Sequence, residues 1–186
     1  MATARIRITG GTARGMPLAE PRGVRLRPTS GLVREAVFNI LGNLVDGARV
    51  LDLFAGTGAL GIEALSRGAC SAVFVEAEPA ACQAILNSLA RTGLAENATV
   101  MRGRLPAALR SLEPSFDLIL MDPPYGLEGV DETLGDLRRL LASNGLVVYE
   151  HGSRYNPPER PAGLQILERR VYGDSAVALY AGLEGE

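Results

Sequence analysis

The sequence has few residues that bind metal ions or form disulfides. Its 186 residues include two cysteines, Cys70 and Cys82, and one histidine, His151. These three side chains cannot complete a four-ligand zinc site, and two cysteines cannot supply a disulfide framework. Both thiols lie among alanines, where cysteine serves as a small packing residue, and we interpret His151 as a structural residue. We therefore expect no metal site and a reducing, cytoplasmic location.

Long apolar runs are also absent. No run approaches the ~20 residues that a helix needs to cross a bilayer, and residues 1–7 lack the apolar core of a secretion signal. Apolar residues still make up 47% of the chain and charged residues 22%, which allows a sizeable core. At ~100 to 200 residues per domain, the length allows one main domain with a small appendage. We expect a monomer without a membrane partner.

Lysine is absent, so all nineteen basic residues are arginines, and their distribution is uneven. Seven arginines and one acidic residue, Glu20, lie between Met1 and Arg34, which gives this segment a net charge of +6. Because the whole chain carries −2, the remainder carries −8. A basic segment ahead of an acidic body indicates that the two parts bind ligands of opposite charge.

After Arg34, short apolar runs alternate with segments of helical periodicity. This alternation predicts an α/β fold with an open, mostly parallel sheet and helices on both faces. The expected strands are Val50–Phe54, Ala72–Glu76, Ala98–Met101, Phe116–Met121 and Leu146–Glu150. The expected helices are Ala59–Arg67, Pro79–Arg91, Leu105–Leu112 and Val130–Ala142.

The two ends of the chain depart from this alternation. Leu164–Val171 and Ala176–Leu183 read as an antiparallel hairpin, and Arg5–Thr9 with Met16–Leu18 as a small glycine-rich β element. Thr29 or Ser30 is expected to cap a helix that runs to about Leu44. The residues expected on its buried face are Leu32, Ala36, Val37, Ile40, Leu41 and Leu44.

A glycine-rich turn follows the first expected strand. Gly56, Gly58 and Gly61 match the spacing G-x-G-x-x-G, and Glu76 ends the next strand twenty residues after the first of them. Glycines let the backbone approach a ligand, the helix N-terminus offers free N–H groups, and an acid at this position binds ribose hydroxyls. The pattern favours a nucleoside cofactor; a turn that only serves packing remains the alternative.

The acid in the first strand narrows the choice of nucleoside. Asp52 would lie close to the pyrophosphate of a dinucleotide, where two like charges repel. S-adenosylmethionine has no phosphate and carries an ammonium and a sulfonium group, so a carboxylate suits it. A nicotinamide-dependent oxidoreductase remains the alternative, and it leaves Asp52 without a role.

The fourth expected strand ends in Asp122-Pro123-Pro124-Tyr125. Two prolines stiffen the backbone at the carboxyl end of the strand, where open α/β sheets bind ligands. The Asp122 carboxylate and the Pro123 carbonyl can accept hydrogen bonds from an exocyclic amine and turn its lone pair toward a methyl donor. Tyr125 offers a face on which an unstacked base can lie. The alternative is a Pro-Pro turn with a half-buried tyrosine.

With these motifs the chain resembles the class I S-adenosylmethionine-dependent methyltransferases, and among them the bacterial 16S rRNA (guanine 966)-N2 methyltransferases. The resemblance runs nearly from end to end. It rests on Arg27–Ser30, Val33–Leu41, Leu51–Gly61, Glu63–Ala69, Asp122–Tyr125 and Tyr172–Ser175. It implies a Rossmann-like, seven-stranded sheet with an antiparallel last strand, and as substrate 16S rRNA or the small ribosomal subunit.

The resemblance also assigns site residues. The implied catalytic residues are Asp122, Pro123, Pro124 and Tyr125. The implied cofactor-binding residues are Asp52, Phe54, Ala55, Gly56, Thr57, Gly58 and Glu76. Many relatives carry an acid or amide after the third strand, where this chain has Gly103-Arg104, so no residue is assigned to the adenine ring. Adenine-N6 methylation of DNA and a non-catalytic RNA-binding module remain as alternative functions.

The basic segment completes the predicted organisation. We expect residues 1–28 to form a β-rich arm that binds RNA phosphates, and residues 29–186 to form the methyltransferase domain. The arginines expected to bind RNA are Arg5, Arg7, Arg14, Arg25 and Arg27.

Overall fold

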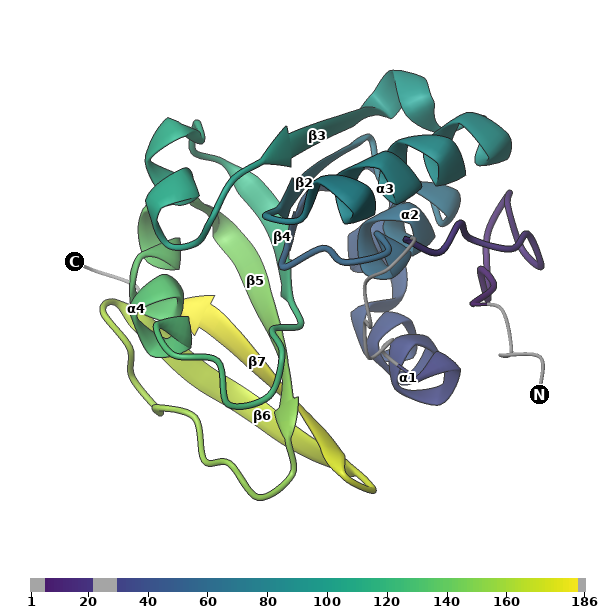
Figure 1. Ribbon diagram of the computed structural model, residues 1–186. Coiled ribbons are helices and arrows are strands. Elements are labelled where there is room, and N and C mark those ends of the chain that lie inside the picture. The colour runs from purple at the N-terminus through teal and green to yellow at the C-terminus, as the bar shows by residue number, and fades with distance from the viewer. Residues whose placement is uncertain (1–5, 22–29, 184–186) are drawn as a thin grey trace.

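The apolar runs form the strands of one seven-stranded sheet (Figure 1). The structure is a computed structural model that describes residues 6–21 and 30–183. The strands are β1 (Arg49–Leu53), β2 (Ser71–Glu76), β3 (Ala98–Arg102), β4 (Phe116–Met121), β5 (Leu141–Gly152), β6 (Leu164–Tyr172) and β7 (Ser175–Gly182). Their order in the sheet is β3-β2-β1-β4-β5-β7-β6. Strands β1 to β5 pair in parallel and β7 pairs antiparallel with both β5 and β6, which confirms the predicted Rossmann-like fold.

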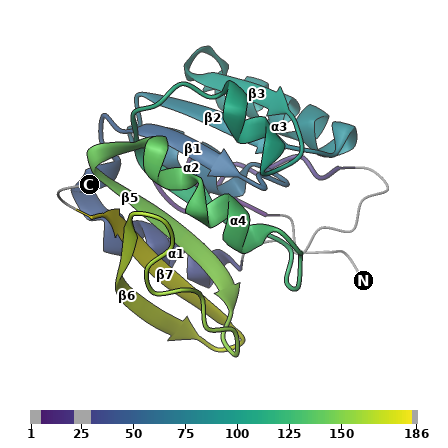
Figure 2. The ribbon, with the colours of Figure 1, turned by 90° about the vertical axis from the view of Figure 1, so that its left-hand side faces the viewer.

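Helices cover both faces of the sheet (Figure 2). They are α1 (Gly31–Leu41), α2 (Ala59–Ser66), α3 (Pro79–Thr92) and α4 (Val130–Gly135). One apolar core joins α1, α2 and α3 to one face, and the second joins α4 and the 3₁₀ turns at 107–111 and 137–139 to the other. Within residues 6–21 and 30–183, no helix is long and apolar enough to cross a membrane.

Two of the expected helices are wrong. A 3₁₀ turn, Ala107–Ser111, replaces the helix expected at Leu105–Leu112. Leu109 in the turn and Leu112 directly after it are buried, at the three-residue spacing of a 3₁₀ helix. In place of a helix at Val130–Ala142, α4 ends at Gly135 and a 3₁₀ turn follows. Glycine weakens a helix, and the next apolar residues, Leu137 and Leu140, are buried at the three-residue spacing of the 3₁₀ turn before β5 begins at Leu141.

Strand β5 begins five residues earlier than expected. Leu141 pairs with Phe116 and Leu146 with Leu118, so the register shifts between these pairs. The extra residues of β5 form an irregularity in the strand, with Ser143 and Asn144 exposed. Such an insertion breaks the apolar pattern by which a strand is recognised in a sequence.

The first helix buries only part of the expected face: Val37 and Leu41 are buried as predicted, whereas Leu32 and Leu44 are exposed. Ser30 caps it, since its Oγ accepts a hydrogen bond of 3.1 Å from the Val33 amide; Thr29 lies outside the described residues. Leu32 and Leu44 are 80% and 57% exposed. The buried residues of α1 are Val33, Arg34, Val37, Phe38 and Leu41. The buried face differs from the expected one because it includes the charged residue Arg34 and because Leu44 lies past the end of the helix.

The N-terminal segment, residues 6–21, packs on the helical face and is part of the core. Its side chains Ile8, Ala13 and Leu18 are buried together with α1 and α2. The expected β element is reduced to one antiparallel bridge between Arg7 and Pro17. The expected boundary at residue 28 lies outside the described residues.

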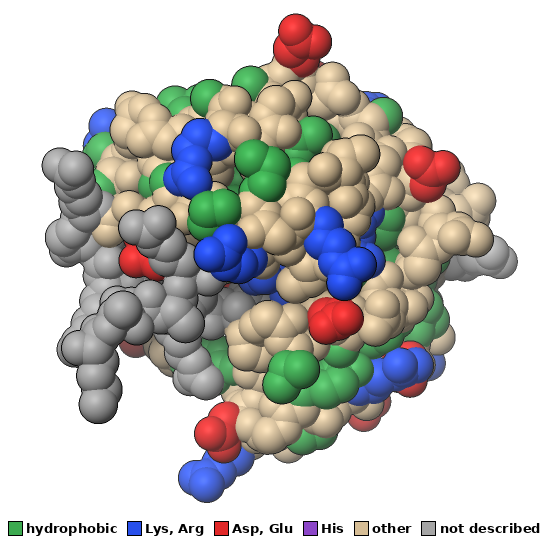
Figure 3. All heavy atoms as spheres, turned by 90° about the vertical axis from the view of Figure 1, so that its right-hand side faces the viewer, with side chains coloured by type: hydrophobic (Ala, Val, Ile, Leu, Met, Phe, Trp, Pro, Cys, Tyr) green, Lys and Arg blue, Asp and Glu red, His purple; other side chains and the backbone are tan. Residues whose placement is uncertain are grey.

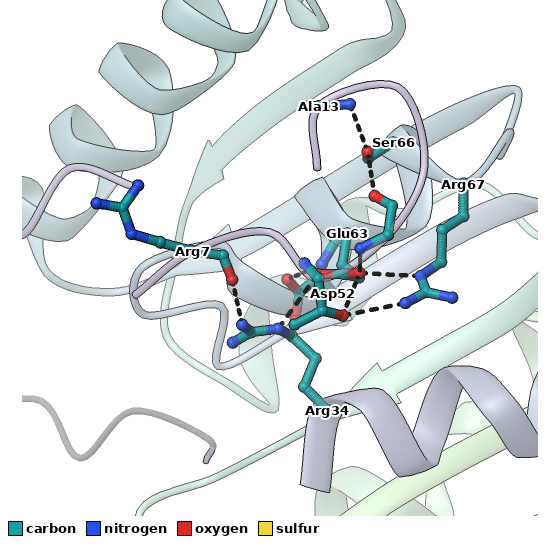
Figure 4. A network of polar contacts seen from close by, with 10 residues as sticks. Arg7, Ala13, Arg34, Asp52, Glu63, Ser66 and Arg67 are labelled. Carbon is teal, nitrogen blue, oxygen red and sulfur yellow. Dashed lines mark hydrogen bonds and ion pairs between the residues drawn. The ribbon is translucent and has the colours of Figure 1, made fainter. Parts of the chain in front are cut away.

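The Glu63 carboxylate on α2 holds this segment in place (Figure 4). It is completely buried and accepts hydrogen bonds from the amides of Thr9 and Gly10 at 2.8 and 2.7 Å. It also pairs with Arg34 of α1 at 3.3 Å and with Arg67 at 2.9 Å. Two basic side chains and two backbone donors therefore compensate one buried negative charge, as burial of a charge requires.

The last turn of α2 adds a second attachment. The Ser66 hydroxyl donates to the Gly10 carbonyl at 2.7 Å and accepts from the Ala13 amide at 2.9 Å. A Cβ atom at Gly11 would lie 1.7 Å from the Ser66 carbonyl oxygen, and the φ of Gly11 is +75°. Only glycine fits where the backbones come this close.

We predict that Glu63→Ala lowers the free energy of unfolding by about 3 to 5 kcal/mol, because it leaves the buried Arg34 guanidinium without its partner. Urea unfolding followed by circular dichroism measures the loss. Glu132→Ala, which removes an exposed carboxylate from α4, is the matched control and should change stability by less than about 0.5 kcal/mol. Equal stability of the two variants would show that Glu63 does not anchor the segment.

Candidate active site

A cavity of about 520 Å³ lies at the carboxyl ends of β1, β2, β3 and β4. Strand order reverses between β1 and β4, since β2 and β3 lie on one side and β5 on the other. Ligands of open α/β sheets bind at such a reversal, because the loops on its two sides diverge. The fold alone therefore predicts a ligand site at this point.

The turn after β1 is tightly wound. Phe54 has a φ of +56°, which is rare for a bulky residue, and Gly56 and Gly58 have φ of +55° and +74°. The Gly58 amide donates to the Ala55 carbonyl at 2.7 Å, and Gly58 is the N-cap of α2. Strain of this kind at Phe54 occurs at functional sites, where the surroundings hold it. The sequence gives no signal for it.

The three glycines of the fingerprint have different roles. Gly56 lines the cavity, whereas Gly58 and Gly61 do not. A Cβ atom at Gly61 would lie 2.3 Å from the Phe74 ring, so this glycine allows α2 to pack closely on β2. The Gly61 amide also donates to the Asp52 carboxylate at 2.8 Å.

Asp52 is a buried carboxylate at the cavity wall. It is 2% exposed, and burial raises its pKa well above the usual aspartate range; the charges of Asp122 and Glu76 raise it further. The Gly61 hydrogen bond opposes this rise. Three carboxylates around one cavity favour a cationic ligand, which would lower their mutual repulsion.

Glu76 at the end of β2 organises the turn. Its Oε2 accepts a hydrogen bond of 2.7 Å from the Gly56 amide, and its Oε1 accepts from the Ala77 and Glu78 amides at 2.7 and 2.8 Å. A carboxylate has about four acceptor positions, so it can still accept from a ligand hydroxyl. Glu76 therefore bonds to two loops that line the cavity, and it lines the cavity itself.

The tetrapeptide Asp122–Tyr125 follows β4 on the other side of the cavity. Its position is fixed by β4, where Met121 pairs with Leu53 of β1 and Tyr149 of β5. All four residues line the cavity. Tyr125 is 40% exposed, and its hydroxyl lies 2.8 Å from the Ser175 Oγ at the start of β7. That contact fixes the phenol and leaves the ring face accessible.

A second cavity of about 820 Å³ adjoins the first. The two share Pro123, Pro124, Tyr125 and Glu150 in their walls. The loop between β4 and α4 forms one side and the end of β5 with the following loop forms the other.

The structure brings most of the predicted site residues together. The predicted residues that line the first cavity are Asp52, Phe54, Ala55, Gly56, Thr57, Glu76, Asp122, Pro123, Pro124 and Tyr125. Gly103 and Arg104 line it as well, at the position for which no ligand contact was assigned. Glu150 and Ser175 were missed as site residues, because their roles depend on neighbours in the sheet and not on a local motif.

Two of the predicted RNA-binding arginines, Arg7 and Arg14, line neither cavity. Arg7 and Arg14 are exposed on the N-terminal segment, and Arg7 donates to the Gly15 carbonyl at 2.8 Å. Arg5, Arg25 and Arg27 lie outside the described residues. The face on the side of this segment carries several separate groups of basic side chains with acidic ones between them (Figure 3).

Other potential ligand-binding groups are few. The part of the chain that the structure describes contains no group of three or more His, Cys, Asp or Glu side chains placed to hold a metal ion. His151 is buried, with its Nδ1 2.9 Å from the Gly152 carbonyl. Cys82 is buried as expected for a packing residue, but Cys70 is exposed, so that expectation was wrong for Cys70.

Comparison with known proteins identifies relatives along the whole chain. The model of the family described as Conserved hypothetical protein 95 matches residues 6–181. The chain is 37% identical to Ribosomal RNA small subunit methyltransferase D of Escherichia coli over 177 residues, 94% of this chain and 89% of the relative. The solved structure of yhhF from Escherichia coli superposes with a TM-score of 0.85 and 32% identity, covering 98% and 100% of the two chains.

A more distant structure, an RNA methyltransferase from Salinibacter ruber in complex with S-adenosyl-L-homocysteine, shares the fold. It is 18% identical, with a TM-score of 0.67 over 86% of this chain and 96% of that one. The near end-to-end match of the family model and of the Escherichia coli relative agrees with the resemblance seen in the motifs. The chain belongs to the Conserved hypothetical protein 95 family.

Proposed function

We propose that this protein transfers the methyl group of S-adenosylmethionine to the exocyclic N2 amine of a guanine in 16S rRNA of the small ribosomal subunit. The proposal rests on one observation: the glycine-rich turn and the tetrapeptide Asp122–Tyr125 line the same cavity. A relative 37% identical over nearly the whole chain is named as a small-subunit rRNA methyltransferase, which supports RNA over DNA as the substrate.

The cavity fits S-adenosylmethionine by charge and by shape. The raised pKa of Asp52 reflects burial and carboxylate repulsion, and a sulfonium and an ammonium group would relieve this repulsion. A dinucleotide would instead place a pyrophosphate among these acids. Glu76 is placed to accept from ribose hydroxyls, and the loop Gly103–Leu105 closes the cavity where the adenine ring would lie. When bound, the cofactor supplies an electrophilic methyl group.

The chain's own residues would position the acceptor amine. The Asp122 carboxylate and the Pro123 carbonyl accept its two N–H groups, which directs the nitrogen lone pair toward the methyl group and stabilises the positive charge that develops on nitrogen. Tyr125, fixed through Ser175, stacks under the base. Orientation of this kind accounts for ~7 to 11 kcal/mol of barrier lowering in favourable cases. The methylated nitrogen then loses one proton to water, so no separate general base is needed.

RNA binding is proposed for the basic N-terminal part, residues 1–28, ahead of a methyltransferase domain at 29–186. Arg7 and Arg14 are exposed on it, and we extend the proposal to Arg5, Arg25 and Arg27. Residues 6–21 also contribute to the core, so the segment cannot be removed without disturbing α1 and α2. Its contribution to RNA binding must be tested by single substitutions.

The proposed reaction predicts one modified nucleoside. Small subunits that lack the modification, incubated with the protein and labelled S-adenosylmethionine, should yield N2-methylguanosine at a single site after nuclease digestion and mass spectrometry. N6-methyladenine in DNA incubated in parallel would instead support the alternative function. RNA binding without any methylated nucleoside would support the non-catalytic alternative.

We predict that Asp122→Ala lowers kcat by at least about 100-fold, because the acceptor amine loses its charged hydrogen-bond partner. The Kd for S-adenosylhomocysteine, measured by calorimetry, should stay within about threefold. Asp136→Ala removes an exposed acid that lines neither cavity and is the control. Full activity of the Asp122 variant would contradict the assigned role.

The raised pKa of Asp52 predicts a pH dependence of cofactor binding. The cationic cofactor favours the charged carboxylate, so binding releases a proton wherever Asp52 is protonated in the free protein. Affinity for S-adenosylmethionine should therefore fall as pH falls through the raised pKa of Asp52, and Asp52→Asn should bind more weakly with a flatter profile. Calorimetry in buffers of different ionisation enthalpy measures the released proton; identical profiles for both proteins would contradict the prediction.

We also predict a change in salt dependence. If Arg14 contacts a phosphate, Arg14→Ala should lower the slope of log Kd against log salt by about 1 and weaken RNA binding. Arg110→Ala, which removes an exposed arginine from the 3₁₀ turn after β3, is the matched control. Filter binding at several salt concentrations measures both slopes, and equal slopes would place the RNA on another surface.

A further inference from the structure

The second cavity is larger than one nucleobase requires. At about 820 Å³ it exceeds the first cavity, and it meets the first at Pro123, Pro124 and Tyr125. A guanine with its N2 amine at Asp122 would occupy the end beside Tyr125. The part of its wall formed by Tyr149, His151 and Tyr155 would remain open to another group.

This part of the wall is an aromatic cluster with one accessible ring. The ring centroids of Tyr149 and His151 lie 5.2 Å apart, and Tyr155 meets both rings edge-on at 6.5 and 5.7 Å. Tyr149 and His151 are buried, whereas Tyr155 is 40% exposed. Edge-on packing supports the Tyr155 ring from one side and leaves a face available for stacking.

The Tyr155 ring is held in place before any ligand binds. Its hydroxyl donates to the Asp131 carboxylate on α4 at 2.6 Å, and its amide donates to the Gly152 carbonyl at 3.0 Å. Burial and the bond to Asp131 raise the pKa of Tyr155 to about 12, so the phenol stays neutral. A fixed ring loses little conformational entropy when a base stacks on it.

The charges around the cavity, five carboxylates beside Arg154, disfavour an anionic group and are compatible with a planar base that carries N–H donors. Acidic side chains predominate in its wall, which disfavours a phosphate. They are Glu128, Asp131, Glu132, Glu150 and Asp174. Burial lowers the pKa of His151, and the nearby Arg169 lowers it further, so its imidazole adds no positive charge. Nucleobases are uncharged, planar and rich in N–H donors that carboxylates accept.

We propose that the second cavity binds the nucleobase adjoining the methylated guanine, stacked on Tyr155. This inference rests on the proposed function. Tyr125 and Tyr155 would then hold two successive unstacked bases, each on a tyrosine whose hydroxyl is bonded to a neighbouring element. Stacking of this type is how proteins hold single-stranded RNA loops.

Substitution of Tyr155 tests the stacking. Tyr155→Ala should raise the KM for the RNA substrate by roughly 5- to 100-fold, the effect of losing one stacked base, with kcat and the Kd for S-adenosylmethionine within about twofold. Tyr155→Phe keeps the ring and should stay within about threefold of the unmodified protein. Leu167→Ala removes an apolar side chain that is 57% exposed on β6, outside both cavities, and serves as control. Thermal unfolding verifies that each variant is folded.

A modified substrate identifies the occupant. In 16S rRNA, an abasic nucleotide on one side of the methylated guanine should raise KM by the same factor as Tyr155→Ala, and combining both changes should add no further effect. An unchanged KM for Tyr155→Ala, or effects of the two changes that multiply, would overturn the inference while the methyltransferase assignment stands. Absence of methyl transfer by the unmodified protein would instead refute the proposed function.

Discussion

The burial of one negative charge, at Glu63, determines how the helical face of this protein is assembled. A carboxylate inside a core must be compensated, and Glu63 is compensated by groups from the N-terminal segment, from α1 and from its own helix. The glycine-rich turn of the candidate site leads directly into α2, the helix that carries Glu63. The helix that follows the glycine-rich turn is therefore held in place by this ion-pair network.

A second group of carboxylates shows the opposite arrangement. Asp52, Glu76 and Asp122 approach one another at the carboxyl ends of three strands, and burial together with the charges of Asp122 and Glu76 raises the pKa of Asp52. Backbone amides of Gly56 and Gly61 partly offset this repulsion, and the remainder is available to a cation. The charge of Glu63 is thus compensated by arginines and backbone amides, whereas the carboxylates around Asp52 repel one another.

Much of this architecture was predictable from the sequence, and the failures have physical causes. Strands β1 to β4 were placed within one residue, because they are continuous apolar runs bounded by glycines or charged residues. The predicted buried face of α1 was wrong in part, because a pattern of apolar residues cannot show that Arg34 is buried against an acid far along the chain. The turn at Phe54, the contact of Tyr125 with Ser175 and the second cavity depend on residues that only the folded sheet brings together.

The position of β7 links the assembly of the candidate site to the synthesis of residues 175–182. This strand lies between β5 and β6, although it is synthesised after both, so the edge of β5 stays unpaired until residues 175–182 are available. The same strand begins with Ser175, whose hydroxyl fixes Tyr125. A nascent chain emerging from the ribosome would therefore possess the glycine-rich turn long before the contact that fixes the Tyr125 ring, which forms only once Ser175 has been synthesised.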